Sequence, residues 1–399
     1  MSENAVAYFL TCMSLAIIGF SVHLMLLRSK KQPVYLPLAG CLAAIAVLIC
    51  QPVVKELAPG LQELFLLFAL PALYLIPPCF WCYVQGITSS TRWQPDRTHL
   101  KHFAPGGVGL FIVICALLLP GELRHAILVE GDEGALTSTS GMVRSIVYGL
   151  VIITFVMVLG WVVQAGFYVH AVFRRLHGYR VQLRELFAST EAQEGRWILW
   201  ILLAVGGVWL FAAGTLLYDN LIAPVQTDTW IRNLVFLIMI WSVAIWGLRQ
   251  KPGFEELYQD GKEAQEALKS ITEKYQRSAL DKQLAERIVN KLNHAMEHDR
   301  LFLDASLSLP KLATHISRSA YHISQTLNET MGVNFFDYVN RYRVNAAKEQ
   351  LQNTDDTVLD IAMNVGFNAK SSFYTAFKKE TQITPNQYRK ALFNSNLES

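Results

Sequence analysis

Seven long apolar segments constrain the fold of this 399-residue chain more than any other feature of its sequence. A helix that crosses a lipid bilayer needs about 20 consecutive, mostly apolar residues. Segments of that kind cover residues 5–27, 36–54, 64–86, 103–120, 146–173, 197–218 and 230–248. Among all of these positions, Arg232 is the one acidic or basic residue. The pattern predicts an all-α protein whose residues 1–252 form a seven-helix transmembrane bundle.

Charged residues are distributed unevenly between the two parts of the chain. The whole chain is 52% hydrophobic and 17% charged, whereas an ordinary soluble domain carries about 25% charged residues. Residues 1–252 contain 17 Lys and Arg and 13 Asp and Glu, and residues 253–399 contain 18 and 19. We therefore expect a soluble region after the apolar one. The net charge of +3 and the lack of a polybasic run do not by themselves predict a nucleic-acid partner.

The basic residues predict the orientation of the spans, because cytoplasmic loops are enriched in Lys and Arg. The first, third and fifth loops hold Arg28, Lys30, Lys31, Arg92, Arg97, Lys101, Arg174, Arg175, Arg180, Arg184 and Arg196. The fourth loop is acidic instead, with Glu122, Glu130, Asp132 and Glu133. If the first span is an uncleaved anchor, the N-terminus lies outside and the region after the seventh span lies in the cytoplasm.

Polar residues near the outer ends of the spans are candidates for a ligand site. Arg144, Tyr218, Asp219 and Arg232 fall near the ends of the fifth, sixth and seventh spans. They could line an outward pocket for a small anionic ligand. Ordinary anchoring at the membrane interface explains the same four residues equally well.

Other potentially reactive side chains within the spans each allow two interpretations. Cys79 and Cys82 form a CxxC motif, which a redox protein uses only when a thiol has a low pKa and lies near water; packing in a helix is the alternative. His23 is either a packing residue or a proton sensor. All six cysteines lie in apolar stretches, which is not the pattern of a disulfide framework. We expect no metal or cofactor, and the last span has no lysine for a retinal Schiff base.

Residues 253–304 are expected to form an amphipathic, coiled-coil signalling linker. Leu257, Gly261, Ala264, Leu268, Ile271 and Tyr275 recur with heptad spacing, and Leu280, Leu284, Ile288 and Leu292 follow every four residues. A dimerising helix between the two regions explains this pattern. A spacer helix that packs on its own domain also explains it.

The C-terminal residues predict two successive units of a short helix, a turn and a longer helix. In the first unit, Leu309–Ile316 and Ala320–Met331 are helices separated by a polar turn, and Gly332 ends the second helix. Phe335–Asn353 is a long connecting helix. The second unit consists of Val358–Val365, a turn at Gly366, and Lys370–Thr381; Thr384 and Pro385 then begin a final helix.

The segment DIAMNVGFNAKSSFYTAFKKETQITPNQYR resembles the signature of AraC/XylS-type transcription regulators. The matching positions are Ile361, Ala362, Gly366, Phe367, Ser371 or Ser372, Phe373, Phe377, Lys378, Thr384, Pro385, Tyr388 and Arg389. LPKLATHISRSAYHISQTLNETMG is similar to the first unit of the same domain. The resemblance covers residues 305–393, and the layout as a whole resembles membrane-bound AraC-type regulators of bacteria. Gln382 departs from the pattern, because the family usually has glycine there.

The resemblance implies a double helix-turn-helix domain over residues 305–393 that reads promoter DNA in two successive major grooves. The implied base-reading residues are Tyr321, His322, Ser324, Gln325, Lys370, Ser371, Ser372 and Thr375. The implied phosphate contacts are Arg341, Arg343, Lys378, Lys379 and Arg389. A solvated helix face is the alternative for each of them. Arg341 and Arg343 could also form ion pairs within the domain, and His322 could be structural.

The sequence therefore predicts a one-component transcription regulator in the bacterial inner membrane, and not an enzyme. It would sense a small effector or a membrane state, bind double-stranded promoter DNA as a homodimer, and contact RNA polymerase. A transporter or channel with a regulatory helical region is the alternative, and a membrane thiol oxidoreductase is a third. The sequence does not identify the effector, the operator, or activation as opposed to repression.

Overall fold

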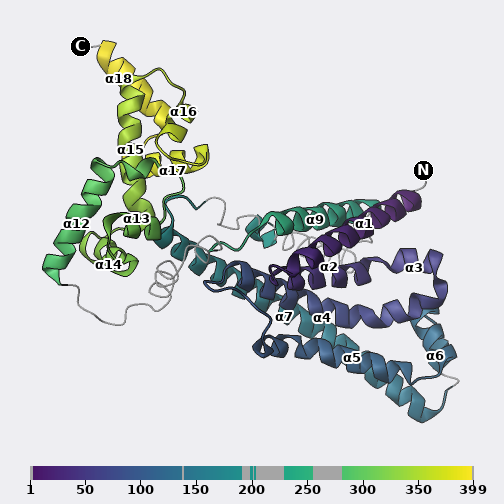
Figure 1. Cartoon of the computed structure of the whole chain (residues 1–399). Coiled ribbons are helices and arrows are strands. Elements are labelled where there is room, and N and C mark those ends of the chain that lie inside the picture. Colours follow the sequence, from purple (N-terminus) through teal and green to yellow (C-terminus); the bar gives the residue numbers. More distant parts are fainter. Residues whose placement is uncertain are drawn as a thin grey trace. The chain divides into compact units, whose positions relative to one another are not determined.

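The computed structural model is helical throughout its described part (Figure 1). The described residues are 3–136, 139–190, 198–200, 202–203, 229–254 and 281–397. They form two compact units. The N-terminal unit comprises residues 1–89, 93–175 and 195–251, and the C-terminal unit comprises residues 90–92, 176–194 and 252–399. Helix α7 contributes residues to both units, because it runs unbroken from Gly141 to Leu186.

The N-terminal unit is a layer of apolar helices packed side by side in the order α9, α1, α2, α4, α5 (Figure 1). Their bounds are α1 Glu3–Ser29, α2 Tyr35–Ile49, α3 Gln51–Leu57, α4 Gln62–Ile87, α5 Ala104–Leu117, α6 Gly121–His125 and α9 Thr229–Arg249. Trp161 of α7 packs with Leu70 and Tyr74 of α4 and with Ile112 of α5. Five helical segments in the described residues are long and apolar enough to cross a membrane. They are Ala5–Ser29, Pro59–Ile87, Arg97–Leu117, Gly141–Leu186 and Trp230–Arg249.

The remaining two predicted spans differ from these five. Residues 36–54 are divided into α2 and α3, which meet at an angle of 57° and would count as one broken span. Pro52 in the first turn of α3 explains the break, because proline has no N–H to donate and its ring clashes with the preceding turn. Residues 197–218 lie almost entirely outside the described residues.

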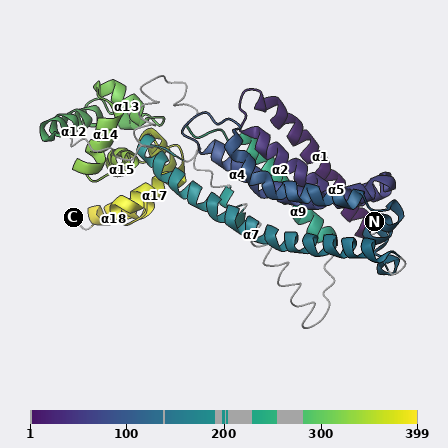
Figure 2. The same cartoon turned by 90° about the horizontal axis from the view of Figure 1, so that it is seen from below.

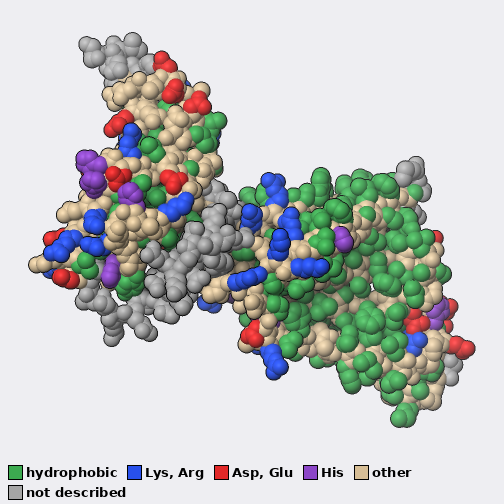
Figure 3. All heavy atoms as spheres, in the orientation of Figure 1, with side chains coloured by type: hydrophobic (Ala, Val, Ile, Leu, Met, Phe, Trp, Pro, Cys, Tyr) green, Lys and Arg blue, Asp and Glu red, His purple; other side chains and the backbone are tan. Residues whose placement is uncertain are grey.

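Apolar side chains predominate on the face of the N-terminal unit that Figure 3 shows. Phe20 is 67% exposed, Phe111 65% and Val163 74%. A soluble protein rarely leaves so large a contiguous apolar surface facing water.

The basic ends of these helices are joined by hydrogen bonds at one end of the N-terminal unit. Arg28 at the end of α1 donates to the carbonyl of Leu248 in α9. Tyr35 Oη donates to Gln250 O at 3.0 Å, and Tyr83 Oη donates to Gly247 O at 3.1 Å. The predicted first and third loops and the residues after the seventh span thus begin at the same end of the unit. The positive-inside argument requires that arrangement.

In its described residues, the C-terminal unit consists of seven α-helices and the end of α7. The helices are α12 Lys282–Glu297, α13 Leu309–Ile316, α14 Ala320–Gln325, α15 Phe335–Asn353, α16 Val358–Asn364, α17 Lys370–Thr381 and α18 Pro385–Leu397. A π-helical turn, η6 (Thr326–Thr330), continues α14, and the short 3-10 helix η5 covers Leu301–Leu303. Ile288 and Leu292 of α12 lie in the same hydrophobic core as α13 and α15. Helix α12 is therefore packed on this unit, as the spacer reading expected. The heptad residues Leu257–Tyr275 lie outside the described residues.

Candidate nucleic-acid interface

Two helix pairs form the candidate interface: α13 with α14, called here the first helix pair, and α16 with α17, the second helix pair. The bounds of α13, α15 and α17 coincide with those expected from the sequence. In the first pair, Ser317 adopts a left-handed conformation (φ 51°) that ends α13. Ser319 Oγ then accepts a hydrogen bond from the backbone N–H of His322 at 3.3 Å and caps α14. The polar turn thus ends one helix and starts the next.

The turn of the second helix pair depends on Gly366. Its φ of +93° is a conformation that side-chain-bearing residues rarely adopt. A Cβ added there would lie 2.6 Å from the carbonyl oxygen of Phe302, so the turn has no room for a larger residue. Phe373 and Phe377, one helical turn apart on α17, are fully buried, and Tyr388 of α18 packs on Phe377. These contacts fix α17 on the domain.

Most of the predicted base-reading residues are accessible. On α14, Tyr321, His322 and Ser324 are half-buried. On α17, Lys370, Ser371 and Thr375 are exposed and Ser372 is half-buried. The ammonium group of Lys370 lies 5.4 Å from the centre of the Tyr374 ring, at the first turn of α17. The two helices therefore both present polar side chains near their N-terminal ends.

Gln325 differs from the other predicted base-reading residues. It is 4% exposed, and its amide nitrogen donates to the carboxylate of Glu329 at 3.0 Å. The expectation that Gln325 reads a base therefore has no support in this arrangement. Its position at the end of α14, where Thr326 and Leu327 are also fully buried, places it against the domain.

The predicted phosphate contacts divide by exposure. Arg341 and Lys378 are exposed. Lys379 is also exposed, but it forms an ion pair with Asp337 at the start of α15 at 2.7 Å. Arg389 is half-buried and donates to the carbonyl of Asp356 at 2.7 Å. Exposed Arg341 and Lys378 are thus the basic residues of this set with no ion pair or hydrogen bond assigned to their side chains.

Arg343 must be removed from the predicted phosphate contacts, because its side chain is wholly buried. Its guanidinium donates to the carbonyls of Phe302 at 2.7 Å and Asp304 at 2.8 Å. It also donates to the carbonyl of Ala188 at 3.0 Å and to Ser189 Oγ at 3.1 Å. A buried guanidinium needs its donors satisfied, and here backbone oxygens supply the acceptors that a phosphate would otherwise provide. Arg343 therefore lies inside the domain, and its main partners are backbone carbonyls; these contacts do not include the carboxylate partner of the expected ion pair.

Two carboxylates of the C-terminal unit have a lowered pKa through local contacts. Burial alone would raise the pKa of Asp304, but hydrogen bonds from the N–H and the hydroxyl of Ser306, both 2.8 Å, outweigh it and lower the pKa. A hydrogen bond to His315 Nε2, at 2.7 Å, lowers the pKa of Asp299. Both groups stabilise loops beside the helix pairs.

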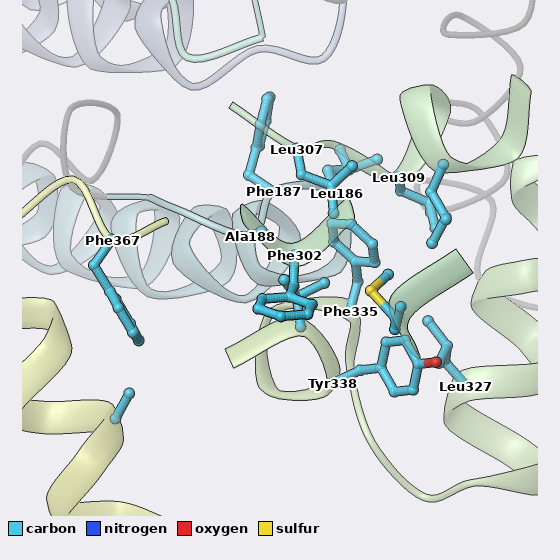
Figure 4. Close-up of a cluster of buried hydrophobic side chains, with 14 of the residues drawn as sticks. Leu186, Phe187, Ala188, Phe302, Leu307, Leu309, Leu327, Phe335, Tyr338 and Phe367 are labelled. Atoms are coloured by element: carbon cyan, nitrogen blue, oxygen red, sulfur yellow. The ribbon is translucent and has the colours of Figure 1, made fainter. Parts of the chain in front are cut away.

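Helix α7 also contributes side chains to the core of this unit, which the sequence did not lead us to expect. Leu183, Leu186, Phe187 and Ala188 lie in the core formed by Phe302, Phe335 and Tyr338 (Figure 4). The backbone N–H of Ala188 donates to Leu307 O at 3.1 Å, within an isolated antiparallel bridge between Phe187 and Ser308. The signal that could have revealed it is the buried stripe Leu176, Tyr179, Leu183 and Leu186, which has helical spacing but lies among the arginines of the fifth loop.

The predicted ligand pocket of the N-terminal unit is only partly described. Arg144 donates to the carbonyls of Leu136 at 2.9 Å and Thr139 at 3.3 Å, so it fastens the loop before α7. Arg232 is exposed on α9. Tyr218 and Asp219 lie outside the described residues.

Among the reactive residues of the apolar helices, the two cysteines of α4 favour packing, whereas His23 is decided for neither of its interpretations. Cys79 and Cys82 are buried as free thiols in α4. A Cβ added to Gly40 of α2 would lie 3.4 Å from Cys79 Sγ, so Cys79 packs where the two helices approach closely. His23 is exposed on α1.

Comparison with known proteins identifies the class of the C-terminal unit. Residues 312–391 match the family described as a helix-turn-helix domain. An uncharacterized HTH-type transcriptional regulator of Staphylococcus aureus is 37% identical over 100 residues, which are 25% of this chain and 13% of that protein. The regulatory protein PocR of Salmonella typhimurium is 32% identical over 103 residues, which are 26% of this chain and 34% of that protein. This chain thus spans only a minor part of either relative.

Two solved structures are each similar to about a quarter of this chain. One is a protein with unknown function from Listeria innocua, 41% identical, with 26% of this chain and 95% of that chain covered and a TM-score of 0.24. The other is the C-terminal domain of the two-component response regulator yesN from Fusobacterium nucleatum, 32% identical, with 27% and 98% covered and a TM-score of 0.23.

The C-terminal unit therefore contains a helix-turn-helix domain of the class that binds DNA in transcription regulators. The match to that family covers residues 312–391, and the regulators named above are similar to about a quarter of this chain.

Proposed function

We propose that this chain is a membrane-embedded, one-component transcription regulator with a double helix-turn-helix domain. The observation that carries the proposal is the presence, in one polypeptide, of a helix-turn-helix domain and of apolar helices long enough to cross a bilayer. Regulators of this kind need no phosphotransfer step, because the sensing and DNA-binding regions belong to the same chain. The apolar surface of the N-terminal unit and its basic end support the proposal that this unit is embedded in a membrane.

In this proposal α14 and α17 enter successive major grooves of promoter DNA. Tyr321, His322 and Ser324 of the first helix pair and Lys370, Ser371, Ser372 and Thr375 of the second approach base edges. Lys can bond guanine acceptors, while Ser and Thr are less selective. Arg341 and Lys378 contact phosphates, and Lys379 and Arg389 add to the positive potential near the backbone. Arg343 and Gln325 are not part of this contact set, because both are buried.

The N-terminal unit would sense a small ligand or a state of the membrane, with its N-terminus outside the cell and the C-terminal unit in the cytoplasm of a bacterial cell. Residues 305–399 have 10 Lys and Arg and 8 Asp and Glu. So small a positive excess gives weak non-specific attraction to DNA. Tight binding would therefore need a homodimer or several adjacent sites, with RNA polymerase as the partner that reads the outcome.

Lys370 and Lys378 of α17 provide a matched test, since each substitution removes one charge from the same helix. The full-length protein in detergent would first select its preferred duplex from fragmented genomic DNA. Lys370→Ala should then lower discrimination at one or two base pairs by about 1–3 kcal/mol. Lys378→Ala should weaken binding to all sequences alike and reduce the salt slope of binding by about one. Binding constants would be measured at several salt concentrations.

Two outcomes would contradict this picture. If the wild-type protein shows no preference over competitor DNA, the regulator proposal is wrong. If Lys370→Ala and Lys378→Ala affect all sequences in the same way, the assignment of base reading to the start of α17 is wrong while the function stands.

A further inference from the structure

The end of α7 and the residues after it form one continuous element of the C-terminal unit. We call residues 176–190 the α7 tail. Leu183 and Leu186 are fully buried, and Phe187 and Ala188 are nearly so, in the core that also holds Phe335 and Phe302 (Figure 4). This tail comes from a position in the chain more than 100 residues before the helix-turn-helix domain. It is nevertheless part of that domain's interior.

The tail contacts the first helix pair through Glu185. Its carboxylate accepts a hydrogen bond from the side-chain amide of Asn328 at 2.9 Å. Asn328 lies in η6, the turn that directly continues α14. The same amide lies 3.4 Å from Ser324 Oγ, one of the proposed base-reading residues. Glu185 therefore holds the C-terminal continuation of the first recognition helix.

The tail contacts the second helix pair through Arg343. The guanidinium binds Ala188 O and Ser189 Oγ of the tail and, on its other side, Phe302 O and Asp304 O. It also lies 5.5 Å from the centre of the Phe367 ring, in the turn that precedes α17. The backbone of the tail is thus joined to the turn that sets the direction of the second recognition helix.

A third contact fastens the tail at the start of α13. The N–H of Ala188 bonds to Leu307 O, and Phe187 bridges Ser308, the residue that precedes α13. The first helix pair is therefore held at two points, before α13 and after α14. The covalent link between the two pairs is α15, and on either side of it lie segments that are not helical, at Gly332 and at residues 354–357. The tail is a second connection that runs beside α15.

We infer that the α7 tail sets the position of the two recognition helices relative to each other, and that Glu185 is a positioning residue for DNA recognition. The inference rests on the proposed function. Two helices that enter successive grooves must match the helical repeat of DNA, about 34 Å. An element that contacts both helix pairs limits how far the distance between the two recognition helices can vary. Since α7 is unbroken from Gly141, it also offers a route from the N-terminal unit to the DNA-reading helices that bypasses residues 253–304.

The test is the dependence of DNA affinity on the spacing between the two half-sites. The full-length protein in detergent would be titrated with its selected duplex and with duplexes carrying one or two inserted base pairs between the halves. Wild type should bind the inserted duplexes at least about tenfold more weakly, because each misplaced base contact costs about 1–3 kcal/mol. Glu185→Ala should bind the selected duplex about fivefold more weakly, the loss expected for one hydrogen bond, and should lose most of the penalty for insertion.

Matched variants separate positioning from general destabilisation. Glu185→Gln keeps an acceptor oxygen for Asn328 and should retain the wild-type spacing penalty. Val181→Ala, on the same helix with a side chain that is 52% exposed, should also behave as wild type. Asn328→Ala should lose the spacing penalty to the same extent as Glu185→Ala, and the double variant should lose no more of that penalty than either single one, because both substitutions remove the Glu185–Asn328 hydrogen bond.

Each remaining outcome decides the inference. If Glu185→Ala weakens binding by the same factor at every spacing, the residue stabilises the fold without positioning the helices, and the inference is overturned while the proposed function stands. The inference is also overturned if inserted base pairs weaken binding by Glu185→Ala as much as they weaken binding by wild type. If wild type selects no sequence at all, the proposed function fails and the inference fails with it.

Discussion

Two arginines on α15 show how strongly the role of a residue depends on which side of a helix it occupies. Arg341 and Arg343 are two positions apart, and residues two apart on a helix do not face the same way. Arg341 is exposed, and Arg343 is the largest of the fully buried side chains. From the sequence, both were expected to contact phosphates or to form ion pairs within the domain. The structure separates them into a candidate phosphate contact and a structural residue.

The arginine pair gives a prediction for stability. Arg343→Met should lower the free energy of unfolding of the C-terminal unit by about 3–5 kcal/mol, because several buried carbonyls would lose their donor. Arg341→Met should change it by less than about 0.5 kcal/mol, as surface substitutions do. Hydrogen exchange of α13 and α15 in the full-length protein would measure both. Equal protection in the two variants would show that the Arg343 contacts add no stability.

At the scale of the element, helix ends follow the local sequence where glycine or a capping residue is present. Ser319 caps α14, and Thr357 caps α16 by accepting a hydrogen bond from the N–H of Asp360 at 3.2 Å. Gln382 is the instructive exception. It ends α17 in the left-handed conformation (φ 65°) that glycine would adopt without strain. Gln382 thus adopts a backbone conformation that favours glycine.

This strained helix end leads to a second stability prediction. Gln382→Gly should raise the free energy of unfolding by about 1 kcal/mol, because the left-handed conformation costs a non-glycine residue about that much. The loss of the hydrogen bond from Gln382 Nε2 to Lys379 O, 3.1 Å, would offset a part. Gly332 (φ +69°), which has open space around its Cβ position, is the reciprocal control. Gly332→Gln should destabilise by a similar amount in the same exchange experiment, and a gain in both variants would exclude backbone strain as the cause.

At the scale of the whole molecule, the basic and acidic loops predict opposite sides of a membrane. Lys30 follows α1, at the end of the N-terminal unit where Arg28 and Tyr35 join α9. Asp132 belongs to the acidic loop before α7. The positive-inside rule places the first in the cytoplasm and the second outside.

A labelling experiment tests that orientation. In intact cells a membrane-impermeant maleimide should label Asp132→Cys and leave Lys30→Cys unlabelled until the membrane is permeabilised. Both positions are exposed, so accessibility to the reagent depends on the side of the membrane alone. The reverse pattern would place the helix-turn-helix domain outside the cell, where it could not reach chromosomal DNA.

The apolar spans and the helices of the C-terminal domain were determined by local sequence. An apolar segment of sufficient length, a periodic stripe such as Phe373 and Phe377, and a glycine at a turn each act within a few residues, so a pattern along the chain is enough to predict them. The break at Pro52 and the extension of α7 to Leu186 were not predicted, although proline and a leucine stripe marked both positions.

Tertiary structure alone decided which residues are inside the C-terminal unit and what completes its core. Arg343 meets Ala188, 155 positions earlier in the chain, and Asn328 meets Glu185, 143 positions earlier. Contacts of that range leave no periodic trace, because each depends on how separate elements pack and not on the sequence around either partner. The C-terminal domain could therefore be recognised from its own residues. A leucine stripe marked the α7 tail as helical, but only the tertiary structure shows that this tail lies in the core of the C-terminal unit.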